Sequence, residues 1–261
     1  MALERFKRIK IGKVKIEKIL SELNHSFVVH YSCESFYDRE DGKSPRITSI
    51  AVRNLGSGQT ESFSIHQIAE REDVDLSDII NHYDRLEKRM LAEFFNFALR
   101  HEQSNWLHWK MRDINYGFPA LEHRAKVLGI NEPYHINDDK RMGMARLMVD
   151  LYSDNYIEHP RLEKLILLND ITNRDFLSGE KEAEAFEKNE YVKLHQSTLR
   201  KVGAIANIFD RVAESRIVTK ANRRQIYGGL YPLIINFLQT HWIISLVGFV
   251  SALIGIFVAI F

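Results

Sequence analysis

Four residues in this chain have side chains and spacings that phosphodiester chemistry uses. Glu34 follows a short apolar run, His108 and Asp113 lie five residues apart, and His195 lies in a later charged segment. Hydrolysis by two metal ions needs several carboxylates, which hold the ions roughly 4 Å apart so that they activate water. Glu34 and Asp113 are carboxylates, the residue type that such chemistry needs.

Cations, hydroxyls and aromatic rings accompany these four residues. Cations and hydroxyls suit phosphate oxygens, and aromatic rings stack on bases. The residues expected to contact a ligand are Ser32, Glu34, Trp106, His108, Trp109, Lys110, Arg112, Asp113, Tyr116, His195, Ser197, Arg200 and Lys201. Each also has a structural alternative. Trp106 and Trp109 would point to opposite faces of a strand, so at least one belongs in the core.

The composition suits one globular domain with an additional segment. The chain has 261 residues, of which 27% are charged and 45% hydrophobic, and its formal net charge is +1. A domain of about 200 residues accounts for most of this length. The balanced charge argues against a strongly basic nucleic-acid protein. The single cysteine, Cys33, excludes an intrachain disulfide and fits a reducing compartment.

Strands are expected in the first quarter of the chain. The basic segment 1–24 lacks the apolar run of a signal peptide and is expected to form an amphipathic helix or to begin a strand. Short runs of β-branched and aromatic residues then predict three antiparallel strands at 25–32, 46–55 and 60–68. A hairpin turn at 56–59 joins the last two.

Helices and one further strand are expected to follow. A helix over 84–102 has one apolar face, formed by Leu86, Met90, Leu91, Phe94, Phe95 and Leu99. A strand is expected at 105–110. The remaining helices are expected at 115–129, 139–153, 160–170 and 181–215, the last broken near 178–187 or at Gly203. The segment GEKEAEAFEK, residues 179–188, is interpreted as a solvated face with i,i+4 ion pairs.

This order resembles the start of the ribonuclease-H-like 3′–5′ exonuclease fold, in which three antiparallel strands, a helix and a parallel strand follow one another. In its DEDD branch the first strand carries Asp-x-Glu, and the strand after the first helix leads into His-Asn-x-x-Phe-Asp. A later helix carries a His and, five residues on, the fourth Asp. The resemblance covers residues 25–130, and less clearly those up to 215. It implies an α/β fold with a mixed sheet and a helical extension.

Two of the four carboxylates that the resemblance requires are present. The residues that match its motifs are Glu34, His108, Asp113 and His195. The residues that depart from them are Ser32, Trp109, Arg112 and Arg200, which replace Asp, Asn, Phe and Asp. A cation such as Arg200 would repel the metal ions that it should help to bind. The resemblance therefore implies a domain that has lost hydrolysis, requires no metal cofactor, and binds a nucleotide or single-stranded DNA. Any residual Mg²⁺ ion would be held by Glu34 and Asp113, the two matching carboxylates. The alternative is a working exonuclease that uses Glu34, Asp113, His195 and either Asp170 or Asp175.

Residues 242–261 are expected to form a transmembrane helix. No Asp, Glu, Lys or Arg follows Arg224, and a helix of this length spans about 30 Å, the thickness of a bilayer hydrocarbon core. The cations before the apolar run are Arg211, Arg216, Lys220, Arg223 and Arg224. By the positive-inside rule they place the N-terminal domain in the cytoplasm. The segment 216–241 would then be a linker and juxtamembrane region.

Small residues recur along this expected span at intervals of three and four. They are Ser245, Gly248, Ala252, Gly255 and Ala259. Such a stripe lies on one helix face and lets helix backbones approach closely, which favours association in lipid. The sequence therefore predicts oligomerisation through the membrane segment, with chance occurrence of small residues as the alternative.

A ligand-binding domain joined to an oligomerising span resembles the membrane effectors of bacterial anti-phage defence, in particular the effector of the Hailong system. In that system an oligodeoxyadenylate made by a partner nucleotidyltransferase holds a channel shut. The resemblance implies a homo-oligomer, for example a tetramer, that crosses the bacterial inner membrane once per chain. The expected parts are the basic segment 1–24, the ligand-binding domain 25–215, the linker 216–241 and the span 242–261. A tail-anchored scaffold without a ligand is the remaining alternative.

Replacement of Gly248 and Gly255 by Leu tests the stripe. The change is expected to convert the detergent-solubilised oligomer to monomer, because the larger side chains hold helix backbones apart. Light scattering coupled to size exclusion measures the mass. Val250→Leu with Ile254→Leu, on another face of the same segment, is the matched control and should leave the mass unchanged. An unchanged oligomer in the glycine variant would contradict the prediction.

Overall fold

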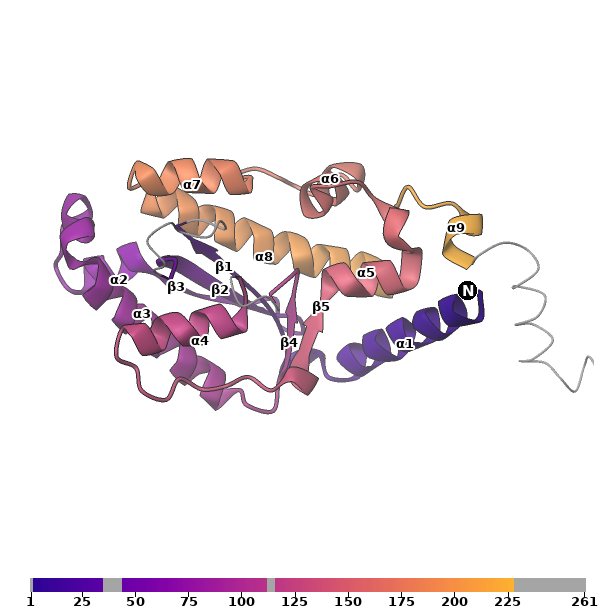
Figure 1. Cartoon of the computed structure of the whole chain (residues 1–261), viewed down its shortest axis with the longest axis horizontal. Coiled ribbons are helices and arrows are strands. Elements are labelled where there is room, and N and C mark those ends of the chain that lie inside the picture. Colours follow the sequence, from indigo (N-terminus) through magenta and orange to yellow (C-terminus); the bar gives the residue numbers. More distant parts are fainter. Residues whose placement is uncertain (1, 35–43, 112–115, 228–261) are drawn as a thin grey trace, which may run out of the picture.

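A five-stranded mixed sheet lies at the centre of the computed structural model, which describes residues 2–34, 44–111 and 116–227 (Figure 1). The strands are β1 Ser26–Cys33, β2 Ile47–Asn54, β3 Thr60–Ser64, β4 Asn105–His108 and β5 Arg141–Gly143. Their order in the sheet is β3-β2-β1-β4-β5. The first three pair antiparallel, and β4 pairs parallel with β1 and with β5. The expected α/β class, and the expected three antiparallel strands with a parallel fourth, are confirmed.

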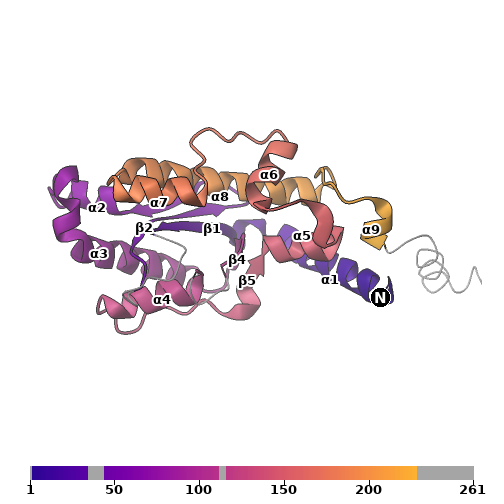
Figure 2. The ribbon, with the colours of Figure 1, turned by 45° about the horizontal axis from the view of Figure 1, so that its top comes forward.

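Helices cover both faces of the sheet. They are α1 Ala2–Ser21, α2 Ile65–Arg71, α3 Ile79–Arg100, α4 Phe118–Val127, α5 Met144–Tyr152, α6 Arg161–Leu168, α7 Gly179–Glu187, α8 Tyr191–Ala213 and α9 Arg223–Tyr227. Short 3₁₀ helices lie at Leu23–His25, Leu76–Asp78, Asp138–Lys140 and Asp154–Tyr156. In Figure 2, α7 and α8 lie over one face and α3 and α4 under the other, while α1, α5 and α9 lie together at one end.

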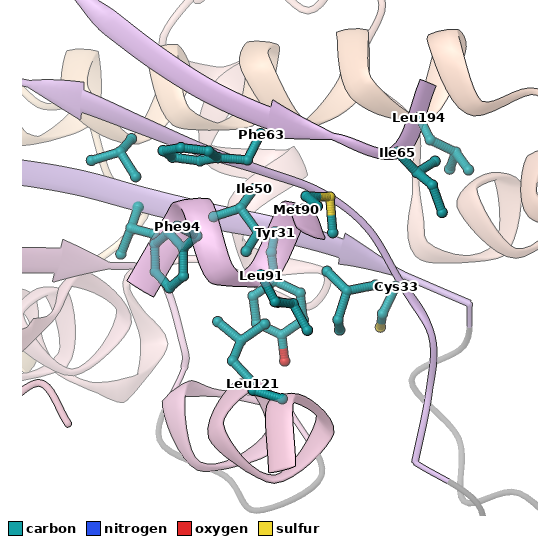
Figure 3. Close-up of a cluster of buried hydrophobic side chains, with 14 of the residues drawn as sticks. Tyr31, Cys33, Ile50, Phe63, Ile65, Met90, Leu91, Phe94, Leu121 and Leu194 are labelled. Carbon is teal, nitrogen blue, oxygen red and sulfur yellow. The ribbon is translucent and has the colours of Figure 1, made fainter. Parts of the chain in front are cut away.

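Strand β1 is buried along its whole length because helices cover both of its faces. Successive side chains of a strand point to opposite faces. Phe27, Val29 and Tyr31 therefore join the core cluster formed with α3 and α4, part of which Figure 3 shows. Val28 joins the second cluster, which α1, α5 and α8 complete. Ser32, on the same face as Val28, is also fully buried and needs polar partners.

The apolar face of α3 is confirmed except at its C-terminal end. Leu86, Met90, Leu91 and Phe94 are fully buried. Leu99 was expected on the same face, but it is 51% exposed. At about 100° of rotation per residue, it falls outside the arc that the other four share.

Several expected element boundaries are wrong. The strand expected over 60–68 ends at Ser64, where α2 begins. The helix expected over 139–153 is preceded by β5, a strand of three residues, and α5 begins only at Met144. The helix expected over 181–215 is broken at 188–190, where Asn189 has a left-handed φ of 58°. Gly203 lies inside α8 and interrupts nothing. The basic N-terminal segment forms the helix α1.

The membrane prediction concerns residues outside this description. Within 2–34, 44–111 and 116–227, no helix has both the length and the apolar character needed to cross a bilayer. The segment 242–261, with its small-residue stripe, lies outside the described residues.

A buried ion pair joins the sheet to α3 and α4. The Glu87 carboxylate accepts hydrogen bonds from Arg124 Nε at 3.0 Å, from Arg124 Nη2 at 2.6 Å and from the Ile47 backbone N–H at 2.7 Å. Burial raises the pKa of Glu87, and the bonds from Arg124 act in the opposite direction. Residues from β2, α3 and α4 thus meet at one charge pair.

Arg124→Met is expected to lower the free energy of unfolding by about 3–5 kcal/mol, because it leaves the Glu87 carboxylate buried without its cation. Urea unfolding of the purified chain, followed by tryptophan fluorescence, measures this change. The double variant Glu87→Gln with Arg124→Met has no charge left to neutralise, so it should be more stable than the single variant. A single variant as stable as the native chain would show that the pair does not matter.

Candidate functional site

Ser32, near the end of β1, lies in a buried network of polar side chains. Its hydroxyl donates to Glu182 Oε1 on α7 at 2.9 Å, and the Ser197 hydroxyl on α8 donates to the same oxygen at 2.9 Å. The Ser197 oxygen in turn accepts from the Leu177 backbone N–H at 3.2 Å. Ser32, Glu182 and Ser197 are all fully buried. The carboxylate therefore joins β1, α7 and α8 through hydrogen bonds shielded from water.

A second run of hydroxyls continues this network to β2. The Thr198 hydroxyl lies 2.9 Å from Ser32 Oγ and 2.7 Å from Ser49 Oγ. Because Ser32 donates to Glu182, its oxygen is free to accept from Thr198, and Thr198 accepts from Ser49. The Thr198 oxygen also lies 3.0 Å from the Leu194 carbonyl oxygen, so its proton has two acceptors, and the run of hydroxyls links β2 through α8 and β1 to the carboxylate. Cooperative chains of this kind strengthen each bond in a low-dielectric interior.

Lys201 supplies the positive charge for the network. Its Nζ lies 2.7 Å from Glu182 Oε2, and the lysine side chain is 6% exposed. The same ammonium lies 5.2 Å from the centre of the Phe176 ring. A buried carboxylate is costly unless a cation neutralises it. The pair therefore makes this interior site electrically neutral while leaving it polar.

His30 and Tyr116 lie beside this network. Burial lowers the pKa of His30 well below 6.5, and the positive charge of Lys201 lowers it further. The Tyr116 hydroxyl donates to the Tyr31 carbonyl oxygen at 3.0 Å and lies 3.4 Å from His30 Nδ1. Burial raises the pKa of Tyr116 well above 10. Both groups are therefore uncharged at neutral pH.

An open groove of about 490 Å³ lies on the outer side of α7. Its lining residues are Glu34, Arg46, Ile80, Ala183, Phe186, Glu187 and Asn189. The Arg46 guanidinium pairs with both oxygens of Glu34, at 2.9 and 3.1 Å. It also lies over two aromatic rings, 4.9 Å from the centre of Tyr83 and 4.8 Å from that of Phe186. The groove thus combines a positioned cation with an aromatic surface.

The structure brings some of the expected ligand residues together. Ser32, Ser197 and Lys201 belong to the buried network, and Glu34 lines the groove. Each of the three network residues is bonded or paired to Glu182, and all three are buried.

The residue at the centre of the network was not predicted from the sequence. Glu182 was expected on a solvated face, yet it is fully buried. A signal was available, because Glu182, Ala185 and Phe186 occur at i, i+3 and i+4, and all three are buried on one side of α7. Thr198 and Ser49 were not predicted, because a single hydroxyl residue forms no sequence pattern that would indicate a buried polar network.

Residues expected around β4 are mainly structural. Trp106 is fully buried and stacks on Phe27 with ring centres 5.5 Å apart, so its ring has no surface left for a base. His108 is also buried, and its Nδ1 accepts from the Met111 backbone N–H at 2.8 Å. Trp109 is partly buried and packs against the second core cluster. Lys110 is exposed.

Two residues expected on α8 lie away from the network. His195 is buried, with its ring 5.0 Å from that of His66 on α2. The pKa of His195 falls from 6.5 to about 4, because burial disfavours the charged ring and His66 adds repulsion. Arg200 lies near the surface, where its Nε donates to the Arg174 carbonyl oxygen at 2.8 Å. Lys201, the next residue, is the cation that reaches the interior.

The expected metal residues are only partly described. Asp113, together with Arg112, lies outside the described residues. Asp170 and Asp175, the alternative acids, are exposed on the segment between α6 and α7. Among the residues that the structure describes, no three His, Cys, Asp or Glu side chains are grouped so as to hold a metal ion.

No protein-family model, curated protein or solved structure matches this chain.

The low pKa of His195 predicts a loss of stability in acid. The folded-state pKa, about 4, lies below the unfolded value of about 6.5, so the unfolded chain binds the proton first as pH falls. Stability from this residue is therefore complete above about pH 6.5 and is lost towards pH 4. His195→Gln should reduce the loss over this window by up to ~3 kcal/mol, as measured by urea unfolding at successive pH values.

His123→Gln is the matched control, because this histidine is exposed. Its pH profile should follow that of the native chain. A His195→Gln profile parallel to the native one would overturn the assignment of the acid sensitivity to His195.

Proposed function

We propose that this chain is an oligomeric membrane effector, in which a ribonuclease-H-like domain without hydrolytic activity binds a nucleotide signal and controls a membrane segment at 242–261. The sheet order supports the fold resemblance, because three antiparallel strands precede a parallel fourth and a long later helix, α8, packs on β1 and β2. The apolar, charge-free sequence of 242–261 supports the membrane part.

The ion pair of Lys201 with Glu182 is the main observation in favour of a domain without hydrolytic activity. In the resemblance, the first strand and the last helix contribute acids that share metal ions. Here Ser32 occupies the first-strand position and donates to Glu182 Oε1. Lys201 Nζ lies 2.7 Å from the other oxygen of the same carboxylate, Glu182 Oε2. A lysine at this point repels divalent cations and already neutralises Glu182. The interior then serves to hold β1, α7 and α8 together.

The groove beside α7 is the proposed ligand site. Its volume, about 490 Å³, lies within the range of about 300–1,000 Å³ that is usual for small-ligand pockets. A phosphate oxygen of the ligand would take the place of Glu34 as partner of Arg46, because guanidinium binds both anions through paired hydrogen bonds. The Phe186 ring is buried beneath Arg46, so it would offer a face for stacking a base only when the ligand draws Arg46 away. A short single-stranded oligodeoxynucleotide or a nucleotide second messenger fits this chemistry.

Helix α7 is the proposed link between ligand and membrane. Ala183, Phe186 and Glu187 line the groove, and Glu182, one turn before Phe186 on the same buried side of the helix, belongs to the buried network. A ligand that moves Phe186 would therefore disturb the bonds of Glu182 to β1 and α8. Helix α8 continues to Ala213, and the chain then leads through α9 towards 242–261. A change at the groove on ligand binding would reach the membrane segment through these helices.

The biological role we propose is bacterial anti-phage defence. A partner nucleotidyltransferase would supply the oligonucleotide, and its presence would keep a channel of the inner membrane closed. Loss of the ligand would open the channel, dissipate the membrane potential and arrest growth. This part of the proposal is supported by the architectural resemblance to the Hailong effector.

Expression of the full chain alone in bacteria tests the proposal. It is expected to depolarise the cells, as measured with a potential-sensitive dye, and truncation after Gln239 is expected to abolish the effect. Binding of a short oligodeoxynucleotide to the purified full chain is expected to weaken about tenfold or more in Arg46→Gln, since a charge-assisted pair is lost. Arg89→Gln, which removes an exposed arginine of α3, is the matched control.

Several results would overturn parts of this proposal. Depolarisation that survives the truncation would remove 242–261 from the mechanism. Absence of any nucleotide or oligonucleotide binding would favour a scaffold. Degradation of labelled single-stranded DNA with Mg²⁺ or Mn²⁺, abolished by Glu34→Ala, would favour the alternative of a membrane-tethered 3′–5′ exonuclease.

A further inference from the structure

One face of α1 combines lysines with exposed aliphatic side chains. Lys7, Lys10, Val14 and Lys18 are exposed and share one side of the helix, with Ile11 beside them. Ile11 is 44% and Val14 55% exposed. In the whole helix, Lys and Arg outnumber Glu by seven to two. Exposed aliphatic groups between lysines are typical of helices that lie in a membrane interface.

The opposite face of α1 is fixed against the domain, so the lysine face keeps its direction. Ile16 and Ile19 are buried in the second core cluster. At Gly12 a Cβ atom would lie 2.9 Å from Leu151 Cδ2 of α5, so α1 and α5 pack closely at this glycine and a larger residue would require the Leu151 side chain to shift. The domain thus uses one face of α1 for packing, which leaves the charged face turned outward.

The N-terminal end of α1 lies beside the point where the chain leads towards 242–261. Arg5 donates from Nε to the Ile226 carbonyl oxygen of α9 at 2.9 Å, and from Nη1 to the Val149 carbonyl oxygen of α5 at 2.9 Å. The Phe6 and Tyr227 rings stack with centres 6.1 Å apart. Figures 1 and 2 both show this end of α1 next to α9.

The remaining length of chain keeps α1 near the proposed membrane. Between Tyr227 and residue 242 there are 14 residues, which even fully extended reach at most about 50 Å. Anionic headgroups attract basic segments within about 10 Å of the surface at ordinary ionic strength. A lysine face that is tied to the last described helix therefore lies within reach of such a surface.

We propose that α1 binds an anionic bilayer surface, with its lysines on lipid phosphates and with Ile11 and Val14 at the boundary between headgroups and acyl chains. This inference rests on the proposed membrane function, because the anchor at 242–261 brings the surface to the helix. The exposed Ile11 and Val14 favour a lipid surface over nucleic acid, since phosphate binding alone has no use for them. Binding would hold the domain in one orientation against the membrane.

The test uses the full chain reconstituted in vesicles, with an environment-sensitive fluorophore on Val14→Cys. The native Cys33 is buried, which limits labelling there. A blue shift and a rise in intensity are expected in vesicles that contain phosphatidylglycerol, and not in vesicles of phosphatidylcholine alone. High salt should reverse the shift. Lys7→Glu with Lys10→Glu and Lys18→Glu should abolish it, whereas the matched set Lys88→Glu, Lys126→Glu and Lys181→Glu, all exposed elsewhere, should not.

Flotation of the same samples separates this inference from the proposed anchor. Flotation with phosphatidylcholine vesicles, together with an unresponsive fluorophore in both vesicle types, would overturn the α1 contact and leave the anchor standing. No flotation with phosphatidylcholine, together with a shift in phosphatidylglycerol, would refute the anchor and support α1. A shift produced by an added oligodeoxynucleotide without vesicles would assign the face to nucleic acid and overturn the proposal.

Discussion

The ion pair between Glu182 and Lys201 is the interaction on which the arrangement of β1, α7 and α8 depends. Both side chains are buried, so neither charge is stable without the other. Each also limits where its helix can lie, because Glu182 must reach Ser32 on β1 while Lys201 approaches from α8. The apolar core alone would tolerate small shifts of α7. A carboxylate that accepts from Ser32 and Ser197 and pairs with Lys201 permits far less movement.

The two faces of β1 explain why the network of hydroxyls around Glu182 lies on one side of the sheet. The face towards α3 and α4 carries Phe27, Val29 and Tyr31 and is packed as an ordinary core. On the other face, Val28 is followed by His30 and Ser32, so the apolar core gives way to a polar interior towards the end of the strand. The helices that cover that end must supply hydroxyls and charge. The polar network is thus a consequence of the period of two in one buried strand.

The sequence predicted the strands and the buried face of α3, because these follow from periodic patterns over several residues. Ser32, Ser197 and Lys201 were expected as ligand contacts, and the buried network that they form with Glu182 was not predicted. It could not predict β5, since three residues are too few to show a period. Lys201 and Arg200 are adjacent cations, and only the direction of each side chain from α8 decides which one is buried. Glu182 lies in a segment rich in charged residues, and this composition predicts exposure for the whole segment. Only the helix face on which a residue lies decides whether that residue is buried. Trp106 lost its expected role because Phe27 covers the ring on which a base would stack.

The groove and the network share α7, and this gives the proposed signalling path a physical basis. α7 has nine residues and is separated from α8 by a short break. Its position depends on two residues of its buried side: Glu182 makes the inner contacts, in the network, and Phe186 makes the outer contacts, beneath Arg46 at the groove. An anion that draws Arg46 away from Glu34 would also remove the cation over Phe186, so binding would act on the outer contacts of α7 directly. The inner contacts lead to α8. At the far end of the domain, Arg5 bonds both α5 and α9, so α1 is joined to the helix from which the chain leads towards 242–261.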